Sequence, residues 1–551
     1  MNLPSERPKP TRRSSQTMLV VSAALVSLLL LAACGSSSSS SQTKSTTGGT
    51  VAAKNGGSLV VAVNGETQGW NPRYDQTAQD GALVESSVLE PLAITGSNLS
   101  AQPWLATSWT PNSTFTSWTI HLRTGVTFQD GEPFDATAVK ANLDDALVGA
   151  LSGMAVKGLI TGTTVVDPQT VQVNMSQPWA AFPSSFLDGQ SAVMIAPKTL
   201  AQSDHGANHP VGTGPFTFVS WTPNANFQTR KNVTYWRKGL PHLDSLTFKV
   251  ITDPTTQASS LQSGDAGLIF TNSAQVASQL QGQFQEIRDW STEPGTVLTN
   301  TIPTVNGKFN PMSNQHARLA LAYATNRQAV AAQQGAGVQS PNSPFPASSP
   351  WGMPESQNGY VTYDVAKAKQ QVTQYEQQTG QSSLDLTLAG TADIGAQRTL
   401  QIIQAMWQQA GIKVTLQSAD QATFITDVVE GNYQTALFAF YSSPDPDQNY
   451  YFWSSSTANG AGKISVNFTQ YTTPKIDADL KTGRQNANMA ARKAAYDDIV
   501  RQINAAAVNI WTYTTPYSLI FAKSVHGLDG ARSVPFGNFQ PKPWWGDVWV
   551  G

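Results

Sequence analysis

Very few residues in this chain stand at spacings that would support catalysis or metal binding. The signatures of zinc proteases, nucleophile-elbow hydrolases and phosphate-binding loops (His-Glu-x-x-His, Gly-x-Ser-x-Gly and Gly-x-x-x-x-Gly-Lys-Ser/Thr) are all absent. His205 and His209 have the spacing of two metal ligands on a helix, but Gly206 and Pro210 indicate a loop there. The segment 212–214, Gly-Thr-Gly, lacks the third glycine of a dinucleotide-binding loop.

The acidic residues do not form a convincing site for a metal ion or for acid–base catalysis. Asp445, Asp447 and Asn449 resemble the first three ligands of a calcium loop, but Tyr450 replaces the required glycine and Ser456 the final glutamate. Adjacent carboxylates at 144–145 and 497–498 fall on predicted helices, where we expect them to be solvated. We therefore expect no catalytic residue, no metal, no cofactor and no enzymatic activity, although a secreted hydrolase using one of the six histidines stays open.

Composition restricts the possible partners. The chain has 551 residues, 40% of them hydrophobic, which is enough for several cores. Its formal net charge is −2, with only 13% charged residues, so electrostatics provide no reason to expect a nucleic-acid partner. The single cysteine excludes an internal disulfide and a cysteine-based zinc cluster.

That cysteine ends a segment typical of protein export. A basic start with Arg12 and Arg13 precedes an apolar run, Met18–Ala33, that is short for a membrane-spanning helix. The junction Leu-Ala-Ala-Cys34 resembles a bacterial lipoprotein signal, in which the thiol is lipidated before cleavage. We expect a signal peptide over 1–33, lipid attachment at Cys34 and a disordered Ser/Gly-rich tether over 34–57. The alternatives are an ordinary secretory signal with an incidental cysteine, or a transmembrane helix.

The elements after residue 58 alternate between strand and helix patterns. Strands are expected at Leu59–Val63, 116–122, 171–175 and 246–250, and a helix capped by Asp135. The later half begins with a β-α-β-α-β order, with strands at 384–388, 412–416 and 435–440 and helices after 400 and after Asp420. A further helix over 488–507 and strand character over 510–521 follow. This order predicts a parallel sheet, whose ligands lie beyond the carboxyl ends of the strands. The loop 441–447, Tyr-Ser-Ser-Pro-Asp-Pro-Asp, lies at such an end and is either a ligand contact or a surface turn.

Several motifs in order resemble one family. They are Leu-Arg-Thr-Gly-Val-Thr-Phe-Gln-Asp-Gly-Glu-Pro-Phe at 122–134, Gly-Thr-Gly-Pro-Phe-Thr-Phe at 212–218 followed by 230–236, then 241–248, 261–265, 318–327, Gly-Ile-Lys-Val at 411–414 and Pro-Asp-Pro-Asp at 444–447. Together they resemble family 5 of the bacterial extracellular solute-binding proteins, the peptide- and nickel-type binding lipoproteins of ABC importers. The resemblance runs from about residue 58 to the end.

The resemblance implies an α/β fold with two lobes, a hinge and an extra inserted domain in lobe one, of the large class-II (cluster C) periplasmic-binding-protein type. It implies lobe one over 58–90, 205–299 and 513–551, the inserted domain over 91–204, and lobe two over 300–512, with crossings near Thr299–Pro303 and Tyr513–Pro516. It also implies a monomer held outside the cell membrane, or in the periplasm, by its lipid. The expected partners are a small-molecule or peptide ligand and the permease and ATPase subunits of an importer.

The family's pocket lies between the lobes. One wall follows an apolar-x-Pro near the start, here Trp70-Asn71-Pro72, which points to Gln76, Thr77 and Ala78. The opposite wall precedes and includes the Asp-Pro-Asp, which gives Tyr441, Ser442, Ser443, Asp445 and Asp447 as ligand-binding candidates.

This chain departs from the peptide binders at one position. Peptide binders often carry Trp-x-x-Asp before the Asp-Pro-Asp to hold a free amine, and here Ala439 and Ser442 stand at those places. We therefore expect binding that does not depend on an α-amine, with an oligopeptide or peptide-like solute as ligand and an oligosaccharide or other neutral compound as the alternative. A sensory role instead of import also stays open. Trp290, Trp544 and Trp545 are either pocket aromatics or packing residues.

Overall fold

The described part of the chain is an α/β structure built on two large sheets and one smaller sheet. The computed structural model describes residues 52–75, 79–96, 99–149, 152–290, 292–440, 443–528 and 543–551. Residues Ala53–Gly551 form one compact unit. The expected signal peptide, Cys34 and most of the tether lie outside the described residues. Within the described ranges, every helix is too short or too polar to cross a membrane.

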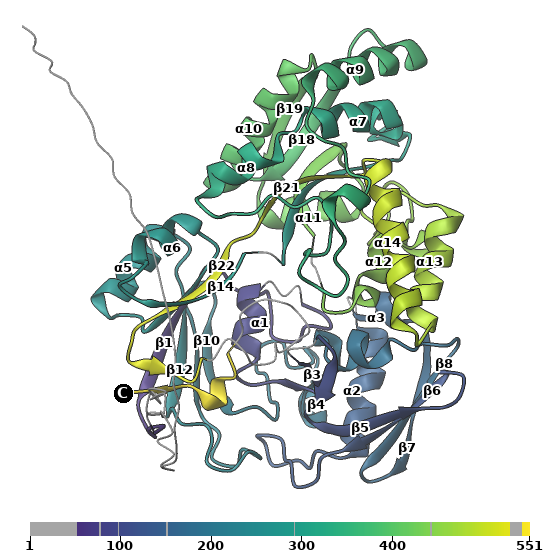
Figure 1. Cartoon of the computed structure of the whole chain (residues 1–551). Coiled ribbons are helices and arrows are strands. Elements are labelled where there is room, and N and C mark those ends of the chain that lie inside the picture. Colours follow the sequence, from purple (N-terminus) through teal and green to yellow (C-terminus); the bar gives the residue numbers. More distant parts are fainter. Residues whose placement is uncertain are drawn as a thin grey trace, which may run out of the picture. The chain divides into compact units, whose positions relative to one another are not determined.

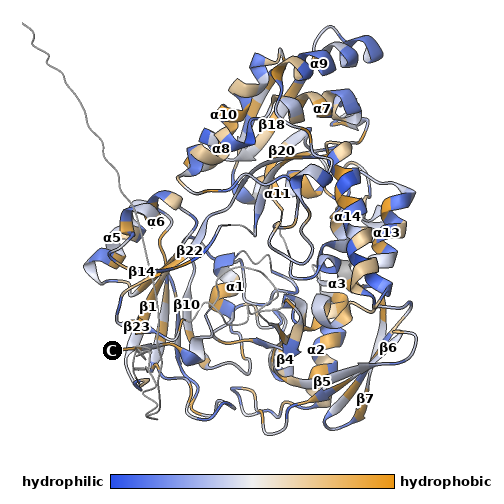
Figure 2. Cartoon of the chain, viewed as in Figure 1, coloured by the Kyte–Doolittle hydropathy of each residue, from blue (hydrophilic) through white to orange (hydrophobic). Residues whose placement is uncertain are grey.

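The first sheet has seven strands in the order β10-β11-β12-β1-β13-β22-β14 (Figure 1). Its strands are β1 (Ser58–Val63), β10 (Phe216–Thr222), β11 (Asn226–Lys231), β12 (Ser245–Val250), β13 (Leu268–Thr271), β14 (Gln285–Asp289) and β22 (Tyr517–Phe521). The expected strands at Leu59–Val63 and 246–250 are confirmed. β1 is hydrophobic from Leu59 to Val63 (Figure 2) because both faces are covered: Val61 packs in one core and Ala62 in the core under α5 and α6.

Three helices lie at this sheet: α1 (Gln79–Glu85), α5 (Pro254–Ser263) and α6 (Ala274–Leu280). Asp253 caps α5 by accepting from the Thr256 N–H, and Pro254 occupies the first turn, where no N–H is needed. Gly264 ends that helix in the left-handed region at φ 84°. We call this sheet with its helices lobe one.

The second sheet has five strands in the order β19-β18-β20-β15-β21. These are β15 (Pro294–Thr299), β18 (Asp385–Thr391), β19 (Lys413–Ala419), β20 (Thr435–Ala439) and β21 (Asn509–Thr514). β18 pairs in parallel with both β19 and β20, which confirms the expected β-α-β-α-β unit. Its crossover helices are α10 (Ile394–Gln409) and α11 (Gln421–Val429), capped by Asp393 and Asp420.

The other helices of this half are α7 (Gln315–Ala324), α8 (Arg327–Gln334), α9 (Val365–Thr379), α12 (Tyr450–Trp453), α13 (Pro474–Gln485) and α14 (Met489–Ala505). Asn488 caps α14, the helix expected over 488–507. We call the five-stranded sheet with its helices lobe two.

A third, antiparallel sheet is inserted into lobe one. Its order is β5-β6-β8-β7, with β5 (Ala106–Pro111), β6 (Ser117–Leu122), β7 (Ile160–Asp167) and β8 (Thr170–Met175), and it packs on α2 (Ala136–Val148). Asp135 caps α2 as expected. Short segments complete this region: β3 (Ala93–Thr95), β4 (Ala101–Pro103), α3 (Ser152–Val156) and the π-helix η1 (Pro183–Leu187), and α4 (Pro197–Leu200) follows it in the chain. β2 (Glu90–Pro91) pairs with β9 (Val193–Met194), so the chain leaves lobe one and returns to it at neighbouring positions. We call residues 92–192, which lie between these two strands in the sequence, the inserted domain.

The chain changes sheet at two places. It leaves lobe one after Asp289 and joins lobe two at Pro294, and it returns at 515–516, between β21 and β22. The second crossing lies where it was expected. The first precedes the expected Thr299–Pro303, because the buried segment 294–299 pairs with β20 and β21 and so belongs to lobe two.

The Gly-Thr-Gly motif has a packing role in the fold. A Cβ on Gly212 would stand 2.2 Å from the Val88 carbonyl oxygen, and a Cβ on Gly214 would stand 2.5 Å from the same atom. The two glycines therefore allow a backbone approach that no other residue permits.

Candidate ligand-binding cleft

Strand directions place the carboxyl edges of both sheets at the two crossings. In lobe one, β1 runs parallel to β12 and β13, and their carboxyl ends lie where Asp289 pairs with Tyr517. In lobe two, β18, β19 and β20 end beside Gly295, next to the pairing of Pro294 with Thr514. Ligands of open α/β sheets bind outside the carboxyl ends of the strands. The candidate cleft therefore lies at these two edges, where the connecting segments 290–293 and 515–516 run.

The predicted wall segments follow strands that end at these edges. Gln76, Thr77 and Ala78 belong to the connection after β1, and Tyr441 and Ser442 to the connection after β20; these five residues lie outside the described ranges. Ser443 is described and is 6% exposed. The topology thus brings the carboxyl ends of β1 and β20 to the edges that meet at the crossings, although the two strands are far apart in the sequence.

The residues just before the first wall segment are fixed to the inserted domain by a buried ion pair. Arg73, whose side chain is 0% exposed, lies 3.1 Å from the Asp145 carboxylate on α2. Arg73 also donates to the carbonyl of Ser191, and the Tyr74 hydroxyl donates to Asp145 at 2.8 Å. Burial lowers the pKa of Arg73, and the Asp145 charge opposes that effect. The segment leading to Gln76 is therefore held by one guanidinium with several partners.

A buried carboxyl group stands just after this wall. Asp80, in the first turn of α1, accepts a hydrogen bond of 2.7 Å from the Asn64 N–H at the end of β1. Burial raises the pKa of Asp80 to about 7, although backbone N–H donors at Asn64, Asp80 and Gly65 oppose that rise. The carboxyl group therefore ties α1 to the edge of the sheet and titrates near neutral pH.

In the second wall segment, both aspartates are engaged by protein groups. Asp445 accepts from Arg492 at 2.5 Å on one oxygen and from the Ser184 hydroxyl at 2.6 Å on the other. Asp447 accepts from Arg484 at 2.8 Å and from the Trp179 indole N–H at 2.6 Å. Both residues were expected at the ligand, and the structure shows both oxygens of each carboxylate hydrogen-bonded within the chain. Asp445 also caps the short helix 446–449 by accepting from the Asp447 N–H.

Nothing in the sequence predicted the partners of these aspartates. Trp179, Ser184, Arg484 and Arg492 carry no motif, and Trp179 is 268 residues from Asp447. A prediction of this cluster would have required knowledge of the tertiary arrangement.

The three tryptophans that the sequence left undecided pack against the protein. Trp290 is 5% exposed and donates its indole N–H to Ser518 at 3.0 Å, next to the first crossing. Trp545 is fully buried in the core of lobe one and donates to the Leu83 carbonyl. Trp544 stacks on Trp104 with ring centres 4.3 Å apart.

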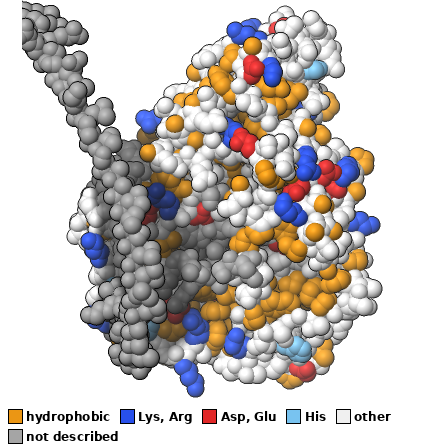
Figure 3. All heavy atoms as spheres, viewed as in Figure 1, with side chains coloured by type: hydrophobic (Ala, Val, Ile, Leu, Met, Phe, Trp, Pro, Cys, Tyr) orange, Lys and Arg blue, Asp and Glu red, His pale blue; other side chains and the backbone are white. Residues whose placement is uncertain are grey.

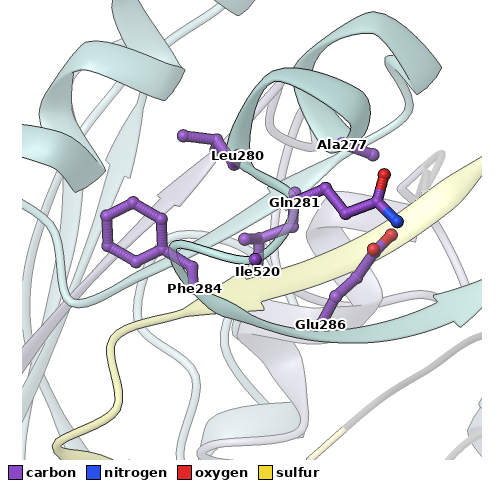
Figure 4. A pocket seen from close by; sticks show the side chains of 7 residues that line it. Ala277, Leu280, Gln281, Phe284, Glu286 and Ile520 are labelled. Carbon is purple, nitrogen blue, oxygen red and sulfur yellow. The ribbon is translucent and has the colours of Figure 1, made fainter.

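A small cavity lies away from the candidate cleft. It has a volume of about 200 Å³ and is lined by residues that include Leu280, Phe284 and Glu286 (Figure 4). These residues lie at the end of α6 and the start of β14, whereas the carboxyl edge of the sheet is at the start of α6 and the end of β14. The cavity is smaller than most ligand sites, which occupy roughly 300–1,000 Å³. We do not assign it to the ligand.

Charges on the visible face are sparse and of mixed sign (Figure 3). This agrees with the 13% content of charged residues.

Comparison with known proteins identifies the family. A model of the bacterial extracellular solute-binding proteins, family 5 (middle region), matches residues 100–461. The chain belongs to this family. The glutathione-binding protein GsiB of Salmonella paratyphi A is 30% identical over 474 residues, which cover 81% of this chain and 87% of that protein.

Solved structures of such proteins share the fold of this family member. The periplasmic binding protein DppA of Helicobacter pylori, in complex with the peptide STSA, aligns with a TM-score of 0.76 at 22% identity, covering 90% of this chain and 98% of that one. AgaA of A. tumefaciens R10, in complex with agropinic acid, aligns with a TM-score of 0.76 at 24% identity, covering 90% of this chain and 99% of that one. The two-lobed fold with its hinge and inserted domain is therefore confirmed. The family member is a solute-binding component of an ABC importer, acts outside the cytoplasm and is not an enzyme, as expected.

Proposed function

We propose that this protein is a lipid-anchored binding protein that captures an oligopeptide or peptide-like solute between its lobes and delivers it to the permease of an importer. The observation that carries the proposal is the meeting of two carboxyl sheet edges at two crossing segments; β1 and β20, the strands that precede the predicted walls in the sequence, both end at those edges. The lipid would be attached at Cys34, and the Ser/Gly-rich tether would allow the lobes to reach the permease.

We further propose that recognition does not depend on a free α-amine. A buried ammonium needs a charged or multiply hydrogen-bonding partner, because its desolvation is costly. Ser442 offers a hydroxyl where peptide binders carry aspartate, and the carboxylates of Asp445 and Asp447 are already paired with Arg492 and Arg484. The segment 441–443 contributes a phenol and two hydroxyl groups, which suit a neutral, hydrogen-bonding part of a solute.

The names of the relatives support a peptide-like solute without fixing one. GsiB is named for glutathione, and the DppA structure contains a tetrapeptide. The complex of AgaA with agropinic acid shows that the same fold also holds a ligand that is not named as a peptide, so a non-peptide solute is the second candidate.

Two measurements test the proposal. Mass spectrometry of a denatured extract of the purified protein identifies any solute that co-purifies with it. Calorimetry then compares glutathione, matched free and N-acetylated oligopeptides, and a panel of oligosaccharides. We expect a peptide-like compound to bind equally well with and without its amine. A loss of about 2 kcal/mol or more on acetylation, the cost of truncating a buried charged pair, would show an amine anchor and contradict the proposal. Binding of the oligosaccharides alone would favour the second candidate.

A further inference from the structure

A buried cluster joins lobe two to the inserted domain beside the second wall segment. Asp447 lies between an arginine of its own lobe and a tryptophan of the inserted domain: Arg484 donates at 2.8 Å and Trp179 at 2.6 Å. The Arg484 guanidinium is stacked between rings, 3.6 Å from the centre of Tyr450 and 5.1 Å from that of Trp179. The exposed fractions of the Arg484 and Asp447 side chains are 8% and 0%.

Asp445, two residues before Asp447, is bound in the same way. Asp445 pairs with Arg492 within lobe two and accepts from the Ser184 hydroxyl of the inserted domain at 2.6 Å. The amide of Gln448 donates to the Ser184 carbonyl at 2.9 Å and to the Asp188 carboxylate at 3.2 Å. Each carboxylate of the loop is therefore shared between an arginine of lobe two and a neutral donor of the inserted domain.

The backbone completes this contact. The Arg484 carbonyl, at the end of α13, accepts from the Ala180 N–H at 2.9 Å and the Ala181 N–H at 3.3 Å. Beside it, the Gln485 amide donates to Gln177 at 3.0 Å. These bonds and the cation–π contact of Arg484 with Trp179 are polar or electrostatic, and Figure 1 shows α13 next to the inserted domain. We call residues 177–188 together with 445–448 and 484–485 the clasp.

The clasp spans a junction that lobe opening would separate. The inserted domain is fastened to lobe one by the buried pair of Arg73 with Asp145, and by Glu90, which accepts from Trp104, Tyr235 and other donors. Lobe two is joined to lobe one by chain only at the two crossings, and hinge motions are absorbed at such short connecting segments. Rotation about the crossings therefore moves lobe two away from the inserted domain and breaks the clasp.

We propose that the clasp is a closure latch, in which Trp179 and Ser184 are positioning residues for the loop that carries Asp445 and Asp447. Their donors complete the hydrogen bonding of Asp447 and Asp445 only when the lobes are closed, and thereby hold residues 445–448 against the inserted domain. Residues that lie outside the predicted walls would then set the ratio of closed to open protein. The proposal depends on the two-lobed architecture and not on the identity of the solute.

Distance measurements between spin labels on the two sides of the latch test this proposal. Lys157 on the inserted domain and Lys481 on α13 are exposed, so each is replaced by cysteine in the full chain carrying Cys34→Ser, which leaves no other thiol. We compare this protein with the variant Trp179→Phe/Ser184→Ala, which removes both donors and keeps an aromatic ring at 179. A hydrogen bond to a charged group contributes about tenfold or more to an equilibrium. We therefore expect the ratio of short to long label distances, without added solute, to fall at least about tenfold.

A matched control separates a latch from a purely structural role. Trp407→Phe removes a buried indole N–H that donates to Thr325 inside lobe two at 2.8 Å. It should lower the melting temperature and leave the label distances unchanged. If the double variant folds poorly, Gln448→Met removes one side-chain donor at a half-buried position and should shift the distances in the same direction. Label distances identical to wild type in the folded variants would overturn the latch, even if the solute proposal stood.

Discussion

Replacement of Asp80 by asparagine should raise the free energy of unfolding relative to that of wild type as the pH increases from acidic to alkaline values. Burial raises the pKa of this carboxyl group from 3.8 to about 7 in the folded protein. Because the folded state holds the proton more tightly, the stabilisation from protonation is fully present below about pH 4 and is lost as pH rises through about 7. The two values differ by about three pH units, and at 1.36 kcal/mol per unit the change is on the order of 4 kcal/mol.

Urea unfolding at several pH values between 4 and 8.5 measures this difference. The asparagine side chain of the variant keeps an oxygen that can accept from the Asn64 N–H, so the hydrogen bond at 2.7 Å is preserved while the titration is removed. We expect the free energy of unfolding of Asp80→Asn, minus that of wild type, to rise by up to about 4 kcal/mol across this range. Leu83→Ala, a fully buried change on the same helix without a titrating group, should show a difference that does not vary with pH. A constant difference for Asp80→Asn as well would refute the reasoning.

Four further predictions concern the anchor, the packing and the closure. Cys34→Ser should leave an unlipidated precursor, whereas mass analysis of wild type should find a diacylglyceryl group at Cys34; an unmodified mature terminus elsewhere would contradict this. Asp145→Asn leaves the buried Arg73 without its anion, and urea unfolding should show a loss of about 3–5 kcal/mol; a change below 1 kcal/mol would count against it. Gly483→Ala places a Cβ 2.5 Å from the Tyr496 ring and should cost about 1–3 kcal/mol in the same assay; unchanged stability would show that the ring can move. A confirmed solute should reduce the radius of gyration in small-angle scattering and, at 100 times its dissociation constant, stabilise the fold by about 2.7 kcal/mol; an unchanged radius would contradict lobe closure.

Elements with strong local signals could be predicted from the sequence. The caps Asp135 and Asp420 lie where they were expected, because a side chain that accepts from backbone N–H groups two or three residues later is a local feature. The parallel β-α-β-α-β unit followed from the alternation of apolar runs and helical spacing. The lobes and the inserted domain followed from the resemblance of motifs to the family.

Features that depend on tertiary contacts could not be predicted. The segment 294–299, Pro-Gly-Thr-Val-Leu-Thr, gave no indication of which sheet it would join, so the first crossing was placed too late. Asp445 and Asp447 are polar residues in a proline-containing loop, and the sequence did not reveal that Arg492 and Arg484 neutralise them. The contacts of Gln76, Thr77, Ala78, Tyr441 and Ser442 with a solute stay predictions.

The position of β22 inside the first sheet has a consequence for how the protein matures. β22 pairs with both β13 and β14, and the Ser518 hydroxyl donates to Glu286 across a sequence separation of 232 residues. Until residues 517–521 arrive, the facing edges of β13 and β14 have no partner, and such edges favour aggregation. Pairing over so long a separation is also slow. Lobe one therefore cannot be completed until residues 517–521, close to the end of the chain, have been synthesised, and the insertion of β22 between β13 and β14 is a late step of folding.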